Sequence, residues 1–126
     1  MKTSDYKKLI IWQKAMDLTV EIYRLIKFLP REETYALSNQ IRRAVVSVPS
    51  NIAEGHGRNS VKEFANFLSI SRGSLLEVET QLEICSRLGY LKNDESTKAN
   101  LLIIEINKMT NAMISYLRKK QLTTNN

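Results

Sequence analysis

The sequence contains little of the chemistry on which catalytic and metal sites depend. Its 126 residues include one cysteine, Cys85, and one histidine, His56. A single cysteine cannot form an internal disulfide, and its position on an apolar stripe predicts a small buried side chain rather than a reactive thiol. Metal sites in helical bundles use several Glu and His ligands, so one histidine predicts that no metal is bound. We expect no cofactor.

The usual signatures of an enzyme are also missing. The sequence has no glycine-rich loop that could hold a nucleotide and no serine in a nucleophile elbow. Two neighbouring carboxylates could act as acid and base, but Glu77 and Glu79 would point to different faces of a helix. We therefore expect a protein without enzymatic activity.

Glycine and proline are scarce, and long apolar segments are absent. Four glycines and two prolines leave little loop, which favours helices. No stretch approaches the roughly 18 uncharged apolar residues of a membrane span, and the first ten residues lack the apolar core of a secretory signal. These absences predict one soluble domain in the cytoplasm, with no membrane partner.

Positive charge is what the sequence has in excess. Nineteen Lys and Arg residues against thirteen Asp and Glu residues give a formal net charge of +6. This balance favours polyanionic partners through long-range attraction. Residues 40–72 concentrate the charge, with two acidic residues, Glu54 and Glu63, against five basic ones. Those five are the candidates for nucleic-acid binding: Arg42, Arg43, Arg58, Lys62 and Arg72.

A polar row within this segment has two interpretations. Arg43, Ser47, Ser50 and Glu54 are spaced four, three and four residues apart, so on a helix they form one row beside the apolar stripe. The row would either contact RNA phosphates, which suit the forked guanidinium of arginine, or form an Arg43–Glu54 network at a helix or subunit contact. The sequence leaves both open.

Apolar residues recur with the period of a helix in four segments. The spacing predicts helices over residues 9–29, 32–54, 60–88 and 94–119. The connections are short, which requires sequential helices to be antiparallel neighbours. The predicted fold is an all-α, up-down-up-down four-helix bundle that forms a single domain. The stripe of the fourth helix is predicted to contain Ala99, Leu102, Ile103, Ile106, Met109, Met113 and Tyr116.

Particular residues mark the ends of these helices. Pro30 ends the first helix, and Gly55 is predicted to cap the second in a left-handed conformation. The S-x-x-E sequence that begins at Ser60 predicts a capping box at the start of the third helix. The fourth helix is predicted to begin with Asn93 or Asp94 as its cap.

Pro49 falls inside the second helical pattern. The apolar period continues across it, so the proline is predicted to kink one helix rather than to separate two. Its ring leaves the carbonyl of Val45 without a helical partner, which Ser47, Ser50 or water would supply.

The first helix has a wider apolar face than the bundle needs. Trp12, Met16, Thr19, Tyr23 and Ile26 form a second stripe beside the core stripe. Three neighbouring helices do not normally cover so wide a face, so we expect another subunit to cover the excess.

Three segments carry a family resemblance. They are LIIWQKAMDLTVEIY at residues 9–23, QIRRAVVSVPSNIAEGHGRNS at residues 40–60 and KEFANFLSISRGSLLEVETQLEI at residues 62–84. Over nearly its whole length the chain resembles the bacterial four-helix-bundle family of 23S rRNA intervening-sequence proteins. A related branch includes the accessory protein of diversity-generating retroelements, a basic homopentamer that engages a protein partner and nucleic acid.

The resemblance implies a homopentamer that associates with nucleic acid, with RNA favoured over DNA and a protein partner possible. It supplies no catalytic residue and no cofactor. The residues that match the family motif, and that we expect to serve assembly, are Gln40, Asn51, Glu54, Ser74, Glu77 and Glu79.

Two functions are compatible with these observations. The first is a non-enzymatic oligomer that binds structured RNA through phosphate contacts, with basic residues of several subunits forming one surface. The alternative is a protein-interaction scaffold without direct nucleic-acid activity, whose contact surface is the wide apolar face of the first helix.

Overall fold

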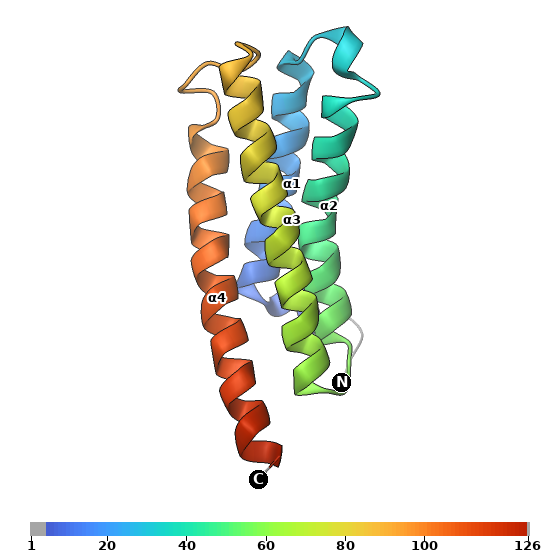
Figure 1. Cartoon of the computed structure of the whole chain (residues 1–126), viewed down its shortest axis with the longest axis vertical. Coiled ribbons are helices and arrows are strands. Elements are labelled where there is room, and N and C mark those ends of the chain that lie inside the picture. The colour runs from blue at the N-terminus through green and yellow to red at the C-terminus, as the bar shows by residue number, and fades with distance from the viewer. Residues whose placement is uncertain (1–4, 126) are drawn as a thin grey trace.

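Four α-helices pack side by side in the computed structural model, which describes residues 5–125, with side chains to residue 123 (Figure 1). They are α1 (Ile10–Leu25), α2 (Leu37–His56), α3 (Val61–Arg87) and α4 (Thr97–Asn125). The colour gradient in Figure 1 reverses direction from each helix to the next, so sequential helices are antiparallel, as predicted. Short 3-10 helices lie at Asp5–Lys8, Ile26–Phe28 and Arg31–Glu33.

The core is formed by the predicted stripes, with one change of register. The largest fully buried side chains include Ile11, Leu18, Ile22, Leu25, Ile41, Ile52, Leu68, Leu75, Ile103 and Ile106. In the second half of α4 the buried positions are Thr110, Ile114 and Leu117, whereas Tyr116 is 64% exposed. The prediction for Tyr116 was therefore wrong. Which row of residues is buried depends on where the neighbouring helices lie. Over so long a helix, the spacing of apolar residues in the sequence did not determine that row.

The end of α1 follows from Pro30. Leu29 is extended, with φ −74° and ψ 147°, because a residue that precedes proline is displaced from the helical region. The last predicted turn forms as the 3-10 helix Ile26–Phe28.

The start of α2 differs from the prediction of residue 32. Arg31–Glu33 form a separate 3-10 turn, and the backbone of Ala36 leaves the helical region before α2 begins at Leu37. The side chain of Glu33 determines this start: its Oε1 accepts from the Leu37 amide at 3.4 Å, and its Oε2 accepts from the Tyr90 hydroxyl at 2.8 Å. One carboxylate thus joins the α1–α2 connection to the α3–α4 connection.

The helix continues through Pro49, as predicted. Of the partners predicted for the freed Val45 carbonyl, Ser50 donates instead to Val46 at 2.8 Å. The Thr19 hydroxyl of α1 donates to the Ala15 oxygen at 2.8 Å, and the Val45 oxygen lies 3.5 Å from the same hydroxyl. The neighbouring helix therefore packs a polar group beside the carbonyl that the proline leaves without a helical partner.

Gly55 is not a left-handed cap. It lies within α2, and of the described glycines only Gly89 has a positive φ, of 81°. A Cβ added at Gly55 would lie 2.5 Å from Cβ of Phe67, far inside van der Waals contact. Glycine is present here because α2 and α3 approach each other closely, which the local sequence pattern does not reveal.

The ends of α3 match the sequence pattern, whereas both ends of α4 do not. Ser60 Oγ accepts from the Glu63 amide at 3.2 Å. Before α4, Glu95 Oε1 accepts from the amide of Lys92 at 2.7 Å and closes a turn, so the helix begins at Thr97 rather than after Asn93 or Asp94. It also continues to Asn125, beyond the predicted end.

Candidate nucleic-acid interface

Charge is distributed unevenly along the length of the bundle. Two contacts between helices define one cross-section of the bundle, which we call the common level. They are the contact of Thr19 with Val45 and the contact of Ser47 with Ser74. Glu105 of α4 lies on the same side of this level as Lys14, with which it pairs at 2.6 Å. On this side, residues 5–18, 46–73 and 105–125 contain ten Lys and Arg against five Asp and Glu. On the other side, residues 19–45 and 74–104 contain eight Lys and Arg against eight Asp and Glu. We call the first group the basic half.

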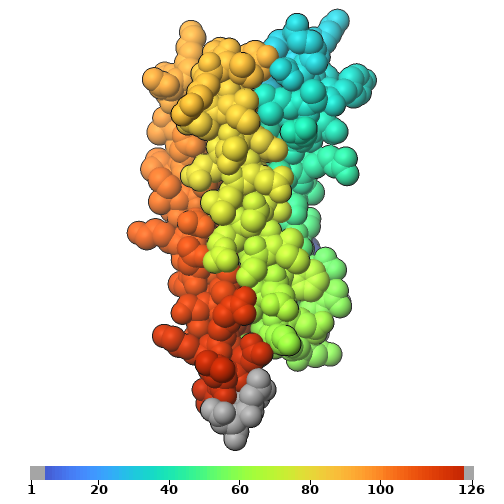
Figure 2. Space-filling view, in the orientation of Figure 1, coloured from blue at the N-terminus to red at the C-terminus, as the bar shows by residue number. Residues whose placement is uncertain are grey.

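The basic half contains the α2–α3 connection and the end of α4. On the face seen in Figure 2 it comprises the red atoms of α4 and the green atoms around the start of α3. Its net excess of five positive charges is nearly that of the whole chain, because the other half contains as many acidic as basic residues. The electrostatic attraction for a polyanion is therefore concentrated at one end of the molecule.

The five predicted nucleic-acid-binding residues do not lie in one patch. Arg58, Lys62 and Arg72 belong to the basic half, whereas Arg42 and Arg43 lie beyond the common level, with Arg42 partly buried. Arg72 Nη1 donates to Asn111 Oδ1 of α4 at 2.7 Å, so this guanidinium also joins two helices. Lys62 is exposed at the start of α3.

Arg58 is held by two neighbours. Its Nη2 forms an ion pair with Glu54 Oε1 at 3.1 Å, and its guanidinium carbon lies 5.0 Å from the centre of the Phe67 ring. Within the chain, Glu54 pairs with Arg58 and not with Arg43. Within residues 5–125, Arg43 has no ion-pair partner.

Sequence reasoning missed the contribution of α4. Arg118, Lys119 and Lys120 at the predicted end of the fourth helix were not counted among the candidate binding residues, but all three lie within α4, and Arg118 Nη2 donates to Ser69 Oγ at 3.4 Å. The signal that could have revealed them is the apolar period, which continues through Leu117.

Most of the predicted assembly residues line the seam between α2 and α3. Asn51 Nδ2 donates to both the carbonyl and the hydroxyl of Ser47 at 2.8 Å, and Ser74 Oγ lies 2.9 Å from that hydroxyl. An open groove of about 390 Å³ runs beside them, lined by Gln40, Arg43, Ala44, Ser47, Ser74, Glu77 and Gln81. The two exceptions are Glu54, which pairs with Arg58, and Glu79, which lines the groove between α3 and α4.

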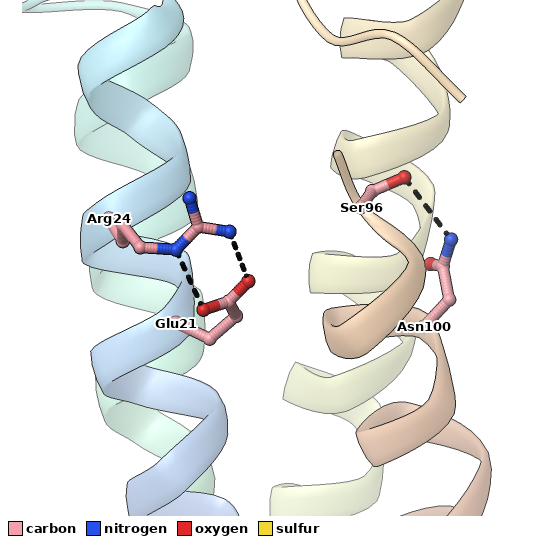
Figure 3. Close-up of polar contacts among 4 residues, drawn as sticks. All are labelled: Glu21, Arg24, Ser96 and Asn100. Atoms are coloured by element: carbon pink, nitrogen blue, oxygen red, sulfur yellow. Dashed lines mark hydrogen bonds and ion pairs between the residues drawn. The ribbon is translucent and has the colours of Figure 1, made fainter. Parts of the chain in front are cut away.

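A buried ion pair on α1 was not predicted. The side chain of Glu21 is 5% exposed and bonds to Arg24 through two contacts, of 2.6 and 3.0 Å. Figure 3 shows this pair and, across from it, Ser96 and Asn100 at the start of α4. The hydrogen bond from Arg24 lowers the pKa of Glu21 against the opposing effect of burial, and the charge of Lys98 adds to the lowering.

This pair makes a pH-dependent contribution to stability. Because the folded pKa of Glu21 is lowered, its contribution is present above the ordinary glutamate pKa and is lost as the pH falls through the folded value. We expect Glu21→Gln to reduce the free energy of unfolding by about 1 kcal/mol at pH 7. The difference should shrink below about pH 4, as measured by urea unfolding. Glu83→Gln is the matched control, because Glu83 and its partner Arg87 are 62% and 81% exposed. If this variant changed the free energy of unfolding by more than about 0.5 kcal/mol, burial of the Glu21 carboxylate would not explain the effect at Glu21.

Cys85 is buried and forms no disulfide. Burial raises the pKa of the Cys85 thiol to about 11, as expected for an inert buried cysteine. Residues 5–125 contain no group of three or more His, Cys, Asp and Glu side chains that could hold a metal ion. None of the helices in this part of the chain is long and apolar enough to cross a membrane.

The sequence matches the family model for the 23S rRNA-intervening sequence protein over residues 7–112. The chain belongs to this family. A crystal structure from Bacteroides thetaiotaomicron VPI-5482, described as a protein with unknown function from the S23 ribosomal protein family, is similar to this member, with a TM-score of 0.77 and 31% sequence identity. The similarity covers 83% of this chain and 98% of that chain. None of the curated proteins matches the sequence.

The match to the 23S rRNA-intervening sequence protein family includes the whole seam between α2 and α3. It ends before Arg118, Lys119 and Lys120. Part of the charge of the basic half is therefore contributed by residues outside the matched region.

Proposed function

We propose that this protein is a non-enzymatic, oligomeric RNA-binding protein of the cytoplasm, whose basic half contacts the phosphates of structured RNA. The observation that carries the proposal is the separation of charge, with ten basic and five acidic residues in one half of the bundle. Contacts between lysine or arginine and phosphate supply most of the affinity in sequence-independent binding. The family name, which refers to 23S rRNA, supports RNA over DNA.

Assembly would use the apolar groove between α1 and α2. This groove, of about 370 Å³, is lined by Tyr6, Trp12, Met16, Thr19, Val46, Pro49, Ser50 and Ala53. Of the second stripe of α1, Met16 and Tyr23 are 38% and 42% exposed, whereas Ile26 is buried and Trp12 packs against the core, contrary to the predicted width of the uncovered face. Val46 of α2 is 41% exposed and widens the apolar surface at this groove. A second copy of the chain that covers this apolar surface would form an oligomer, and the family resemblance supports five subunits. Five basic halves in one particle would strengthen the attraction for RNA.

The salt dependence of RNA binding tests the proposal. Fluorescence anisotropy with a labelled RNA hairpin should show affinity falling about 100-fold between roughly 50 and 200 mM salt, as expected for about four phosphate contacts. A DNA duplex of equal length should bind more weakly. Absence of RNA binding at the lower salt concentration would overturn the proposal.

A second candidate function, a protein-interaction scaffold, is favoured by the groove between α3 and α4. This groove has a volume of about 650 Å³, and its walls include the aliphatic side chains of Leu82, Ile84 and Ile104. Ile84 and Ile104 are exposed, and Glu79 and Glu83 lie at the same groove. An aliphatic groove with carboxylates suits a basic amphipathic segment of a partner protein. This function would remain if RNA binding failed.

A further inference from the structure

A cavity of about 390 Å³ lies at the end of the basic half, between the α2–α3 connection and α4. Its volume falls within the range of small-molecule sites. The residues that line it come from the end of α2, the connection, the start of α3 and the end of α4: His56, Arg58, Asn59, Ser60, Val61, Phe64, Leu117 and Lys120. The cavity therefore depends on the packing of α4 against the α2–α3 connection.

Three side chains with a basic nitrogen meet at the cavity. His56 is the last residue of α2, Arg58 belongs to the connection, and Lys120 belongs to α4. The ring of His56 packs edge-on against Phe64, with the ring centres 5.5 Å apart. Arg58 is positioned by Glu54 and Phe67. His56 and Arg58 are thus held in place before any ligand arrives, which reduces the entropy lost on binding.

Apolar side chains and further polar groups complete the lining. Val61, Phe64 and Leu117 provide the apolar part, and Asn59 can donate a hydrogen bond from its side chain. Glu54, four residues before Arg58, is already paired with it at 3.1 Å. Glu63 is exposed on the first turn of α3 and is not among the lining residues. The balance of charge at the cavity is therefore positive.

We infer that this cavity binds a terminal phosphate monoester of an RNA strand. A terminal phosphate carries close to two negative charges and three unesterified oxygens, so it can accept from donors that converge from three segments. An internal phosphodiester carries one charge and two such oxygens, and it cannot engage all three groups equally well. The inference rests on the proposed function and adds to it a preference for strand ends.

Two RNA hairpins of identical sequence test the inference, one with a 5′-phosphate and one with a 5′-hydroxyl. Anisotropy at about 50 mM salt should give at least about tenfold tighter binding of the phosphorylated hairpin, as charge-assisted bonds to a dianion predict. Equal affinities with steep salt dependence would overturn the inference and leave the proposed function intact. Absence of binding by both hairpins would overturn both.

Adjacent lysines provide the matched variants. Lys120→Gln should abolish the preference for the phosphorylated hairpin, whereas Lys119→Gln, which removes the same charge one residue away and outside the cavity, should weaken both hairpins equally and preserve their ratio. Both positions are exposed, and circular dichroism checks that the helices are intact. A ratio unchanged in Lys120→Gln would overturn the assignment of the site. Adenosine monophosphate that binds as tightly as the phosphorylated hairpin would overturn the assignment to strand ends.

Discussion

Replacing Lys7, Lys62 and Lys119 together by glutamine will lower the affinity for structured RNA about 30-fold at roughly 50 mM salt. All three side chains are exposed and belong to the basic half, but to different helical segments. Each lysine that contacts a phosphate releases about one counterion, so the variant should also show a shallower slope of affinity against salt, by up to about three. Anisotropy titrations at several salt concentrations measure both quantities.

The other half of the bundle supplies a charge-matched control. Replacing Lys27, Arg31 and Lys92 by glutamine removes the same net charge from exposed positions outside the basic half. We expect less than about a threefold loss of affinity, because screening weakens attraction over distances beyond about 10 Å. Equal losses in the two variants would mean that net charge, rather than its position, governs binding, and the basic half would no longer be the interface.

Gly55→Ala should reduce the free energy of unfolding by about 2 kcal/mol, even though alanine is the better helix former. The new methyl group would lie 2.5 Å from Phe67 Cβ and 3.1 Å from Phe64 Cδ1. Cβ of Phe67 cannot move by changing rotamer, so the clash can be relieved only by separating α2 from α3. Urea unfolding followed by circular dichroism gives the free-energy difference.

Gly73→Ala is the matched control for this substitution. Gly73 also lies inside a helix, but a Cβ there would meet no atom within 4 Å. Alanine should stabilise the protein at this position by about 0.5–1 kcal/mol through helix propensity alone. If Gly55→Ala destabilises the protein and Gly73→Ala stabilises it, α2 and α3 approach each other closely at Gly55. Stabilisation at both would show that the helices adjust without cost.

The four helices could be predicted from the sequence because each buries a stripe with the helical period. Pro30 and Ser60 also act locally, and the structure confirms their effects on helix ends. The start of α2 could not be predicted, since it depends on a hydrogen bond between Glu33 and Tyr90, which are 57 residues apart in the sequence. The contact of Thr19 with Val45 escaped prediction for the same reason.

The candidate interface was harder to predict than the fold. Counting charged residues along the sequence identified residues 40–72 as basic. In the bundle, however, α2 and α3 distribute those basic residues over different faces and along its length. The basic half became visible only when residues distant in sequence were placed at a common level. Gly55 shows the same limit, because a cap and a close helix contact favour glycine equally and the sequence alone does not distinguish them.

The last turns of α4 extend beyond the ends of the neighbouring helices (Figure 1). Arg118, Lys119 and Lys120 lie just before these turns, where Arg118 contacts Ser69 of α3, and Leu122 is exposed within them. Isolated helical turns are only marginally stable in water, so these last turns can open at a small fraction of the free energy of global unfolding. When they open, the adjoining Lys119 reaches a larger volume of solution than a rigid side chain does, which raises the rate of productive encounters with an extended ligand. The end of this helix would then limit the speed of RNA capture, while the rigid connection between α2 and α3 would determine how long the complex lasts.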